Sequence, residues 1–131
     1  MDQDNLGPAI EKMGITFSEL TAEHAVGIMP LEGNTQPFGI LHGGAAALLA
    51  ESVASFAAHQ WAKQFGKSAV GAHLDITHLK PGTSDRIICT ADAVHLGRRT
   101  AVYRFDNTSE DTGKIISTGL MTCYLVEEQP R

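Results

Sequence analysis

Residues 45–62 constrain the fold most, because they are apolar almost all the way round a helix. Alanine and leucine, both strong helix formers, dominate this segment. It predicts one helix of about five turns, about 30 Å long. A helix that is apolar on nearly every side must be enclosed by other structure, so we expect it in the centre of the domain. Gly66 marks its exit, as a C-terminal glycine commonly does.

Short extended segments surround this helix in the sequence. A polar connection at residues 21–24 joins two of them and predicts a hairpin. Four more follow the helix with short turns between them, which is typical of an antiparallel meander. The predicted extended segments are residues 15–20, 25–31, 69–79, 86–96, 100–107 and 114–126. A short helix within residues 5–13 precedes them, with Pro8 in its first turn.

This order of elements predicts an α+β domain in which an antiparallel sheet of about five to six strands wraps one long helix. With 131 residues and 43% hydrophobic content, the chain can bury one core, so we expect a single domain over residues 1–131. Charged residues make up only 19% of the chain, which favours a homo-oligomer whose contacts cover part of the surface.

Charge and hydropathy exclude several classes of partner. The formal net charge of −5 argues against nucleic acid, which requires a broad basic face. No uncharged apolar stretch has the length of a membrane span, so no membrane partner is expected. The polar N-terminus carries no visible targeting signal, and we therefore expect a cytoplasmic protein whose cysteines, Cys89 and Cys123, are reduced core residues.

Glu51 is the one ionisable residue in the apolar part of the predicted helix. Burying an unpaired carboxylate is costly, so it needs a partner, exposure at an interface or a chemical role. A polar stripe follows it at spacings of one, four and eight residues: Ser52, Ser55 and His59. This stripe fits either a solvated helix face or a polar catalytic face, in which Ser55 would bond the carboxylate or a water that it activates.

The sequence His42-Gly43-Gly44 stands where the helix begins. Free backbone N–H groups and the positive end of the helix dipole are found there, and glycines leave those amides open to a substrate. A thioester carbonyl at this position would have its developing negative charge stabilised. A Gly-Gly pair alone is equally typical of a tight turn, but here Glu51 follows and adds a nucleophile or base to the same helix.

These motifs resemble those of hotdog-fold thioesterases of the 4-hydroxybenzoyl-CoA and phenylacetate-degradation type. The matching residues are Gln36, His42, Gly43, Gly44, Glu51 and Ser55, together with His95-x-Gly97-Arg98-Arg99. In element order the resemblance extends over essentially the whole chain. It implies a hotdog fold in which subunits pair so that their sheets join, active sites that lie between subunits, and a homodimer or a homotetramer formed by two such dimers.

The resemblance also implies an activity, the hydrolysis of an acyl-CoA thioester to a free acid and CoA. No cofactor is implied, since coenzyme A is part of the substrate. Glu51 would attack the thioester or activate water, and the Gly44 N–H would polarise the carbonyl. Gln36 and His42 would assist that polarisation, and Ser55 would position the water or the carboxylate. A glutamate at position 51 is typical of aryl-CoA and enterobactin-proofreading relatives, which favours aromatic or β-ketoacyl groups.

Coenzyme A carries phosphate charges that an acidic protein must meet with a local basic patch. Lys80, Arg98 and Arg99 follow predicted strand ends, and the resemblance implies a nucleotide near the latter two; an ordinary cluster of turn charges is the other interpretation. His78 falls near a position where some relatives have a substrate-facing residue. The histidines show no ligand spacing for a metal, so no metal site is expected.

Two other functions remain open from the sequence. A hotdog-fold acyl-CoA hydratase or dehydratase also uses an acidic residue and a histidine near a central helix. A non-catalytic acyl-CoA-binding protein needs the same fold without turnover. The side chains that could shape an acyl pocket are more typical of plain core residues: Met29, Phe38, Phe56 and Trp61.

Overall fold

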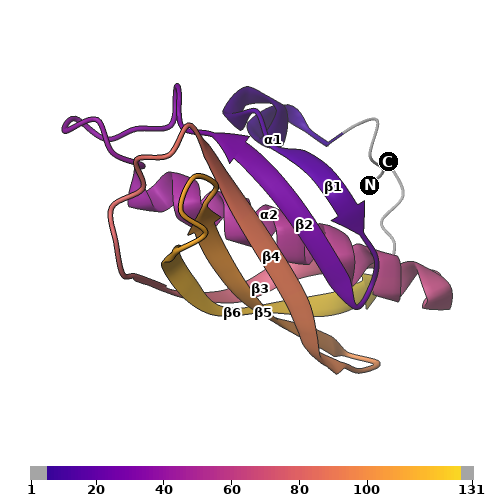
Figure 1. Cartoon of the computed structure of the whole chain (residues 1–131). Helices are drawn as coiled ribbons and strands as arrows, with labels where there is room; N and C mark the ends of the chain where they lie inside the picture. The colour runs from indigo at the N-terminus through magenta and orange to yellow at the C-terminus, as the bar shows by residue number, and fades with distance from the viewer. Residues whose placement is uncertain (1–5, 128–131) are drawn as a thin grey trace.

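The structure, a computed structural model, describes residues 6–127 and combines one long helix with one sheet (Figure 1). Its elements are α1 (Pro8–Met13), β1 (Thr16–Leu20), β2 (His24–Pro30), α2 (Gly43–Ala62), the 3-10 turn η1 (Lys63–Phe65), β3 (Lys67–His78), β4 (Arg86–Leu96), β5 (Thr100–Ser109) and β6 (Ile115–Glu127). The α+β prediction of a long helix wrapped by an antiparallel sheet is confirmed.

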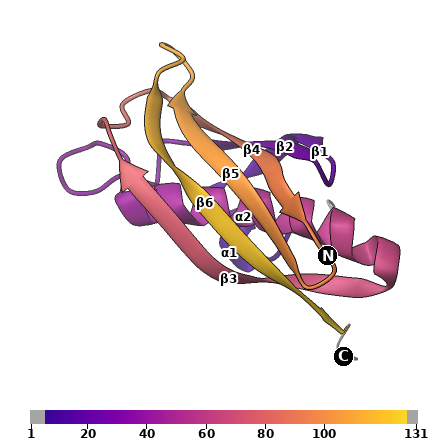
Figure 2. The same ribbon diagram turned by 90° about the horizontal axis from the view of Figure 1, so that it is seen from below.

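The sheet has six strands in the order β1-β2-β4-β5-β6-β3, and every neighbouring pair is antiparallel (Figure 2). The predicted hairpin is β1–β2. The predicted meander is right for β4, β5 and β6 but wrong for β3, which pairs with β6 instead of β4. After β2 the chain forms α2 and then enters the sheet again as β3, at the edge opposite β1. The two edge strands are therefore β1 and β3.

The core lies between α2 and the inner face of the sheet. Leu49 and Val53 of α2 are fully buried there, and the inward side chains of β5 and β6, including Phe105 and Met121, cover them. The alanines of α2 allow this close approach. Gly27 of β2 lies at one such point of contact. A side chain there would collide with the helix, because a Cβ on Gly27 would lie only 2.4 Å from Val53 Cγ2.

Both cysteines are free and fully buried, on β4 and β6, as predicted for core residues. Burial is also the largest cause that raises the pKa of each thiol above its ordinary range, to about 11 for Cys123. Both thiols are therefore protonated, and weakly nucleophilic, at neutral pH.

Between residues 6 and 127, no helix combines the length and the apolar character that crossing a membrane requires.

A substitution of Gly27 tests this packing. Gly27→Ala should lower the free energy of unfolding by about 2 kcal/mol, because the β-branched Val53 side chain is buried and cannot move aside. Urea denaturation measures the loss. In the double variant with Val53→Ala, the removed methyl groups make room for the new one. The double variant should therefore lose less stability than the sum of the losses measured for the two single variants. Fully additive losses would contradict the proposed close contact.

Candidate active site

The start of α2 is held by its own capping side chain and by two neighbouring loops. His42 has extended backbone angles (φ −68, ψ 131), and its Nδ1 accepts the Gly44 N–H at 2.8 Å, which makes it the N-cap. The His42 N–H in turn donates to the Asn34 carbonyl at 2.9 Å, and the Leu41 N–H donates to the Gly82 carbonyl at 2.8 Å. The first amides of α2 are thereby fixed in position.

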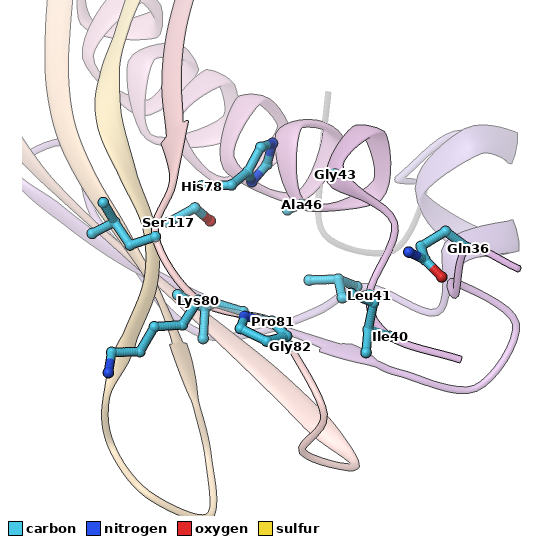
Figure 3. A pocket seen from close by; sticks show the side chains of 12 residues that line it. Gln36, Ile40, Leu41, Gly43, Ala46, His78, Lys80, Pro81, Gly82 and Ser117 are labelled. Atoms are coloured by element: carbon cyan, nitrogen blue, oxygen red, sulfur yellow. The ribbon is translucent and has the colours of Figure 1, made fainter. Parts of the chain in front are cut away.

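The two glycines of the motif line different cavities. Gly43 lines the larger one, of about 400 Å³, together with His78, and a Cβ on Gly43 would lie 2.8 Å from His78 Nε2 (Figure 3). The remaining lining residues of this cavity are Gln36, Ile40, Leu41, Ala46, Leu79, Lys80, Pro81, Gly82, Ile116 and Ser117. Gly44 lines a second cavity, of about 300 Å³, with His42 and Leu48. Among the described residues around the larger cavity there is a lysine but no carboxylate.

Gln36 belongs to a short turn at the rim of the larger cavity. Its backbone N–H donates to the Ile40 carbonyl at 2.9 Å, and its carbonyl accepts the Gly39 N–H at 3.0 Å. Its side-chain oxygen accepts the Phe38 N–H. A backbone amide can only donate, so the oxygen must face Phe38 and the Gln36 NH₂ group is left as a donor. Figure 3 shows that nitrogen on the side of the cavity.

Glu51 lies on the same helix but outside this cavity. It is exposed in the single chain, so of the alternatives that the sequence left open, burial of the Glu51 side chain does not apply to one copy of the protein. Its side chain lies against β3, where a Cβ on Gly71 would be 3.5 Å from Glu51 Oε2. Ser55, one turn on, is half-buried, and its hydroxyl is 3.8 Å from Cys123 Sγ. Glu51 is eight residues after Gly43, which corresponds to about 12 Å along the helix axis.

The predicted basic residues lie at opposite ends of the molecule. Lys80 lines the larger cavity beside the start of α2. Arg98 and Arg99 lie beyond the other end of α2, where Trp61 Nε1 donates to the Gly97 carbonyl at 2.7 Å. The Arg98 guanidinium stacks over the Phe65 ring, 4.7 Å from its centroid. Since α2 has 20 residues, about 30 Å separate the two groups.

One chain therefore brings together only part of the predicted site. Gln36, His78 and Lys80 meet at the larger cavity, and His42 caps the helix beside it. Glu51 with Ser55, and Arg98 with Arg99, lie elsewhere. Within residues 6–127 no group of three His, Cys, Asp or Glu side chains is arranged to hold a metal ion.

The sequence interpretation overlooked two residues of this region. Gly43 received no role of its own, because the resemblance assigns the polarising N–H to Gly44, yet Gly43 is the first residue of the helix and lines the cavity. The preference of an N-cap side chain for the second or third helical amide is the signal that could have distinguished the two glycines. Phe38 was taken as a core residue, but its side chain is 88% exposed. Met29 and Phe56 are buried, as predicted.

The sequence and structure are similar to those of proteins named as esterases or thioesterases. Residues 38–116 match the thioesterase superfamily. ComA2 of Bacillus subtilis is 41% identical over 95 residues, which cover 72% of this chain and 75% of ComA2. The proofreading thioesterase EntH of Cronobacter sakazakii is 28% identical over 126 residues, covering 95% of this chain and 91% of EntH. A mutant of thioesterase PA1618 from Pseudomonas aeruginosa superposes with a TM-score of 0.86 at 31% identity, covering 96% of this chain and 94% of that one. The chain belongs to the thioesterase superfamily and is a thioester hydrolase with the hotdog fold.

Proposed function

We propose that the protein hydrolyses the thioester of an acyl-CoA, in a site that two copies of the chain complete together. The observation that carries this proposal is the cavity at the start of α2. Groups that can polarise a carbonyl meet there, yet no carboxylate among the described residues 6–127 lines it. The carboxylate that the reaction needs, Glu51, stands exposed on the same helix.

We assign the polarising amide to Gly43 instead of Gly44. The Gly44 N–H already donates to His42 Nδ1, so a substrate would have to compete with the helix cap for it. Gly43 is the first residue of α2, its N–H has no acceptor within the helix, and it lines the cavity. The Gln36 NH₂ group supplies a second donor. Two donors at a helix N-terminus can stabilise the oxyanion that forms when a thioester carbonyl is attacked.

Glu51 of the same chain is too distant to attack a carbonyl bound at Gly43. A hydrogen bond of about 2.9 Å to the carbonyl oxygen and an attack contact of about 3 Å on its carbon require the two groups to be within about 7 Å. The helix separates them by about 12 Å along its axis. Glu51 also rests against Gly71. The missing carboxylate must come from a second copy.

The free edge of β3 offers the way to pair two copies. Among the described strands β3 has only β6 beside it, so its outer backbone groups are open to another strand. Two β3 edges related by a two-fold axis pair in antiparallel fashion, and the two α2 helices then also run antiparallel. If the helices cross near Ala47, Gly43 of one copy lies opposite Glu51 of the other, because both are four residues from Ala47. Ala47 is small and half-buried, as a close crossing requires.

The proposed chemistry needs only protein groups and water. In one route Glu51 takes a proton from water, the hydroxide adds to the carbonyl, and the C–S bond breaks as the leaving sulfur is protonated. In the other route the Glu51 carboxylate itself adds, CoA leaves as the thiol, and water hydrolyses the resulting anhydride. Ser55 orients the water or the carboxylate in both. The products are a carboxylic acid and CoA.

Antiparallel helices also bring basic groups of both copies to one substrate. Lys80 is at the cavity, and Arg98 and Arg99 of the second copy lie on the same side of the crossing at Ala47, because the end of that copy's α2 extends about 16 Å beyond the start of the first. These charges would hold the CoA phosphates. From the resemblance we infer an aromatic or β-ketoacyl group, a cytoplasmic location, and a dimer or a homotetramer of two such dimers.

Glu51→Gln should lower kcat by about a hundredfold or more, since the amide is neither a base nor a nucleophile. The melting temperature should stay unchanged because Glu51 is exposed. Thiol release from benzoyl-, acetoacetyl- and hexanoyl-CoA measures the activity. Ser55→Ala should cause a smaller loss, since it only orients. Glu127→Gln, a second exposed glutamate, is the control, and full activity in Glu51→Gln would rule out the proposed role.

Gly43→Pro should abolish activity without disturbing the helix. Proline is favoured in the first turn, and His42 already has the extended backbone that precedes a proline, but the substituted residue has no N–H. Gly43→Ala is the matched control, because it crowds His78 similarly and keeps the N–H. We expect the loss of activity mainly in kcat, and we expect kcat of Gly43→Pro to be about a hundredfold lower than kcat of Gly43→Ala. Equal kcat values in the two variants would contradict the assignment.

Mixing the two inactive variants tests whether the site is shared. In a mixed dimer of Glu51→Gln and Gly43→Pro subunits, a shared site leaves one of the two sites fully intact. Random reassembly should therefore restore about a quarter of the wild-type rate. If both groups acted within one chain, every site would carry one defect and the mixture would stay inactive. Mixing each variant with itself through the same procedure provides the baseline.

A further inference from the structure

Phe38 stands at the apex of a rigid turn beside the proposed site. The Gln36 N–H bonds to the Ile40 carbonyl, and Gly39, with φ 84, follows a turn in which its N–H bonds to the Gln36 carbonyl. This is a three-residue hairpin loop that ends in a left-handed glycine, and Pro37 occupies the first turn position, which favours its fixed φ. The loop is thus held by hydrogen bonds, and Phe38 is presented at its tip.

The ring of Phe38 is the most exposed of the large apolar side chains between residues 6 and 127, at 88%. A phenyl ring presented to water by a rigid loop is stabilised when an apolar group covers it, because apolar surface is then removed from water. The loop projects beyond the start of α2, away from the body of the sheet (Figures 1 and 2). Within residues 6–127 almost nothing covers the ring, so it is open to contact with a bound ligand.

The position of Gln36 indicates which partner that is. Its side-chain oxygen bonds directly to the Phe38 N–H, and its NH₂ group faces the cavity. Only the side-chain amide of Gln36 would therefore stand between the Phe38 N–H and a carbonyl that accepts from this NH₂ group. The Phe38 ring does not itself line the cavity in one chain, but it belongs to the residue whose N–H fixes the Gln36 amide at the rim.

We propose that Phe38 selects the acyl group by forming an apolar wall against it. This inference rests on the proposed function. A thioester carbonyl carries the acyl group on one side and the pantetheine arm of CoA on the other. The arm contains two amides that seek hydrogen bonds, whereas an acyl group can be wholly apolar. An exposed phenyl ring complements the apolar side, and an aromatic acyl group adds ring-to-ring attraction. The substrate class is an acyl-CoA with a large apolar or aromatic acyl group.

The test compares kcat/KM for benzoyl-CoA with kcat/KM for acetyl-CoA, whose methyl group offers little surface to a ring. Phe38→Ala should lower the benzoyl-to-acetyl ratio about tenfold, with acetyl-CoA hydrolysis nearly unchanged. Phe38→Leu keeps apolar bulk and loses the ring, so the ratio should fall by a smaller factor. Val94→Ala is the matched control, since Val94 is an apolar side chain of β4 that is 53% exposed and lines neither cavity.

Three results would overturn this inference. An unchanged ratio in Phe38→Ala would mean that the ring does not touch the acyl group. An equal loss for both substrates would mean that residue 38 only supports Gln36. A shift to a smaller species in size-exclusion chromatography, without a change in the ratio, would assign the ring to a subunit contact. Failure of the proposed function itself looks different, because the wild-type protein would then release no thiol in a Glu51-dependent manner.

Discussion

Burial of α2 is the condition on which the other features depend. A helix of alanine and leucine with almost no polar side is unstable in water, and the six strands exist in this order because together they cover it. Gly27 shows how tightly the cover fits, since the strand approaches Val53 without any side chain between them. The sheet nevertheless leaves one strip of the helix open, which includes Ala47 and Glu51. The strip that the sheet leaves open is therefore the part of the helix that carries Glu51, so the cover of the helix and the site are incomplete at the same place.

The open strip explains the division of the chemistry. The helix dipole and the free amides lie at its start, where Gly43 meets His78 and the cavity. A carboxylate close to those amides would be held by them and would occupy the place of the substrate. A carboxylate two turns further along avoids this, and in the proposed dimer it would serve a carbonyl bound to the other copy. In that proposal, Glu51 is kept away from the amides of its own helix and is brought close to those of the second copy.

Sequence reasoning predicted the elements well where a local signal sets them. The apolar run predicted α2, the His42-Gly43-Gly44 motif predicted its start, and Pro8 predicted the start of α1. The pairing of β3 with β6 was missed because strand order depends on how the helix crosses the sheet, which no local pattern encodes. Whether Glu51 is exposed could not be decided from the sequence, for a related reason. An apolar helix indicates that something covers it, but the sequence does not say whether that cover belongs to the same chain. Phe38 was misjudged although Pro37 and Gly39 carry the signal of a turn, because hydrophobicity was given more weight than turn chemistry.

The cap of α2 also determines the proton arrangement of the His42 ring. Because Nδ1 accepts the Gly44 N–H, that nitrogen carries no proton, and the neutral ring must hold its proton on Nε2. One tautomer is thus selected by a backbone amide. The shape of the first turn of α2 and the tautomer of one imidazole are therefore a single property of this protein.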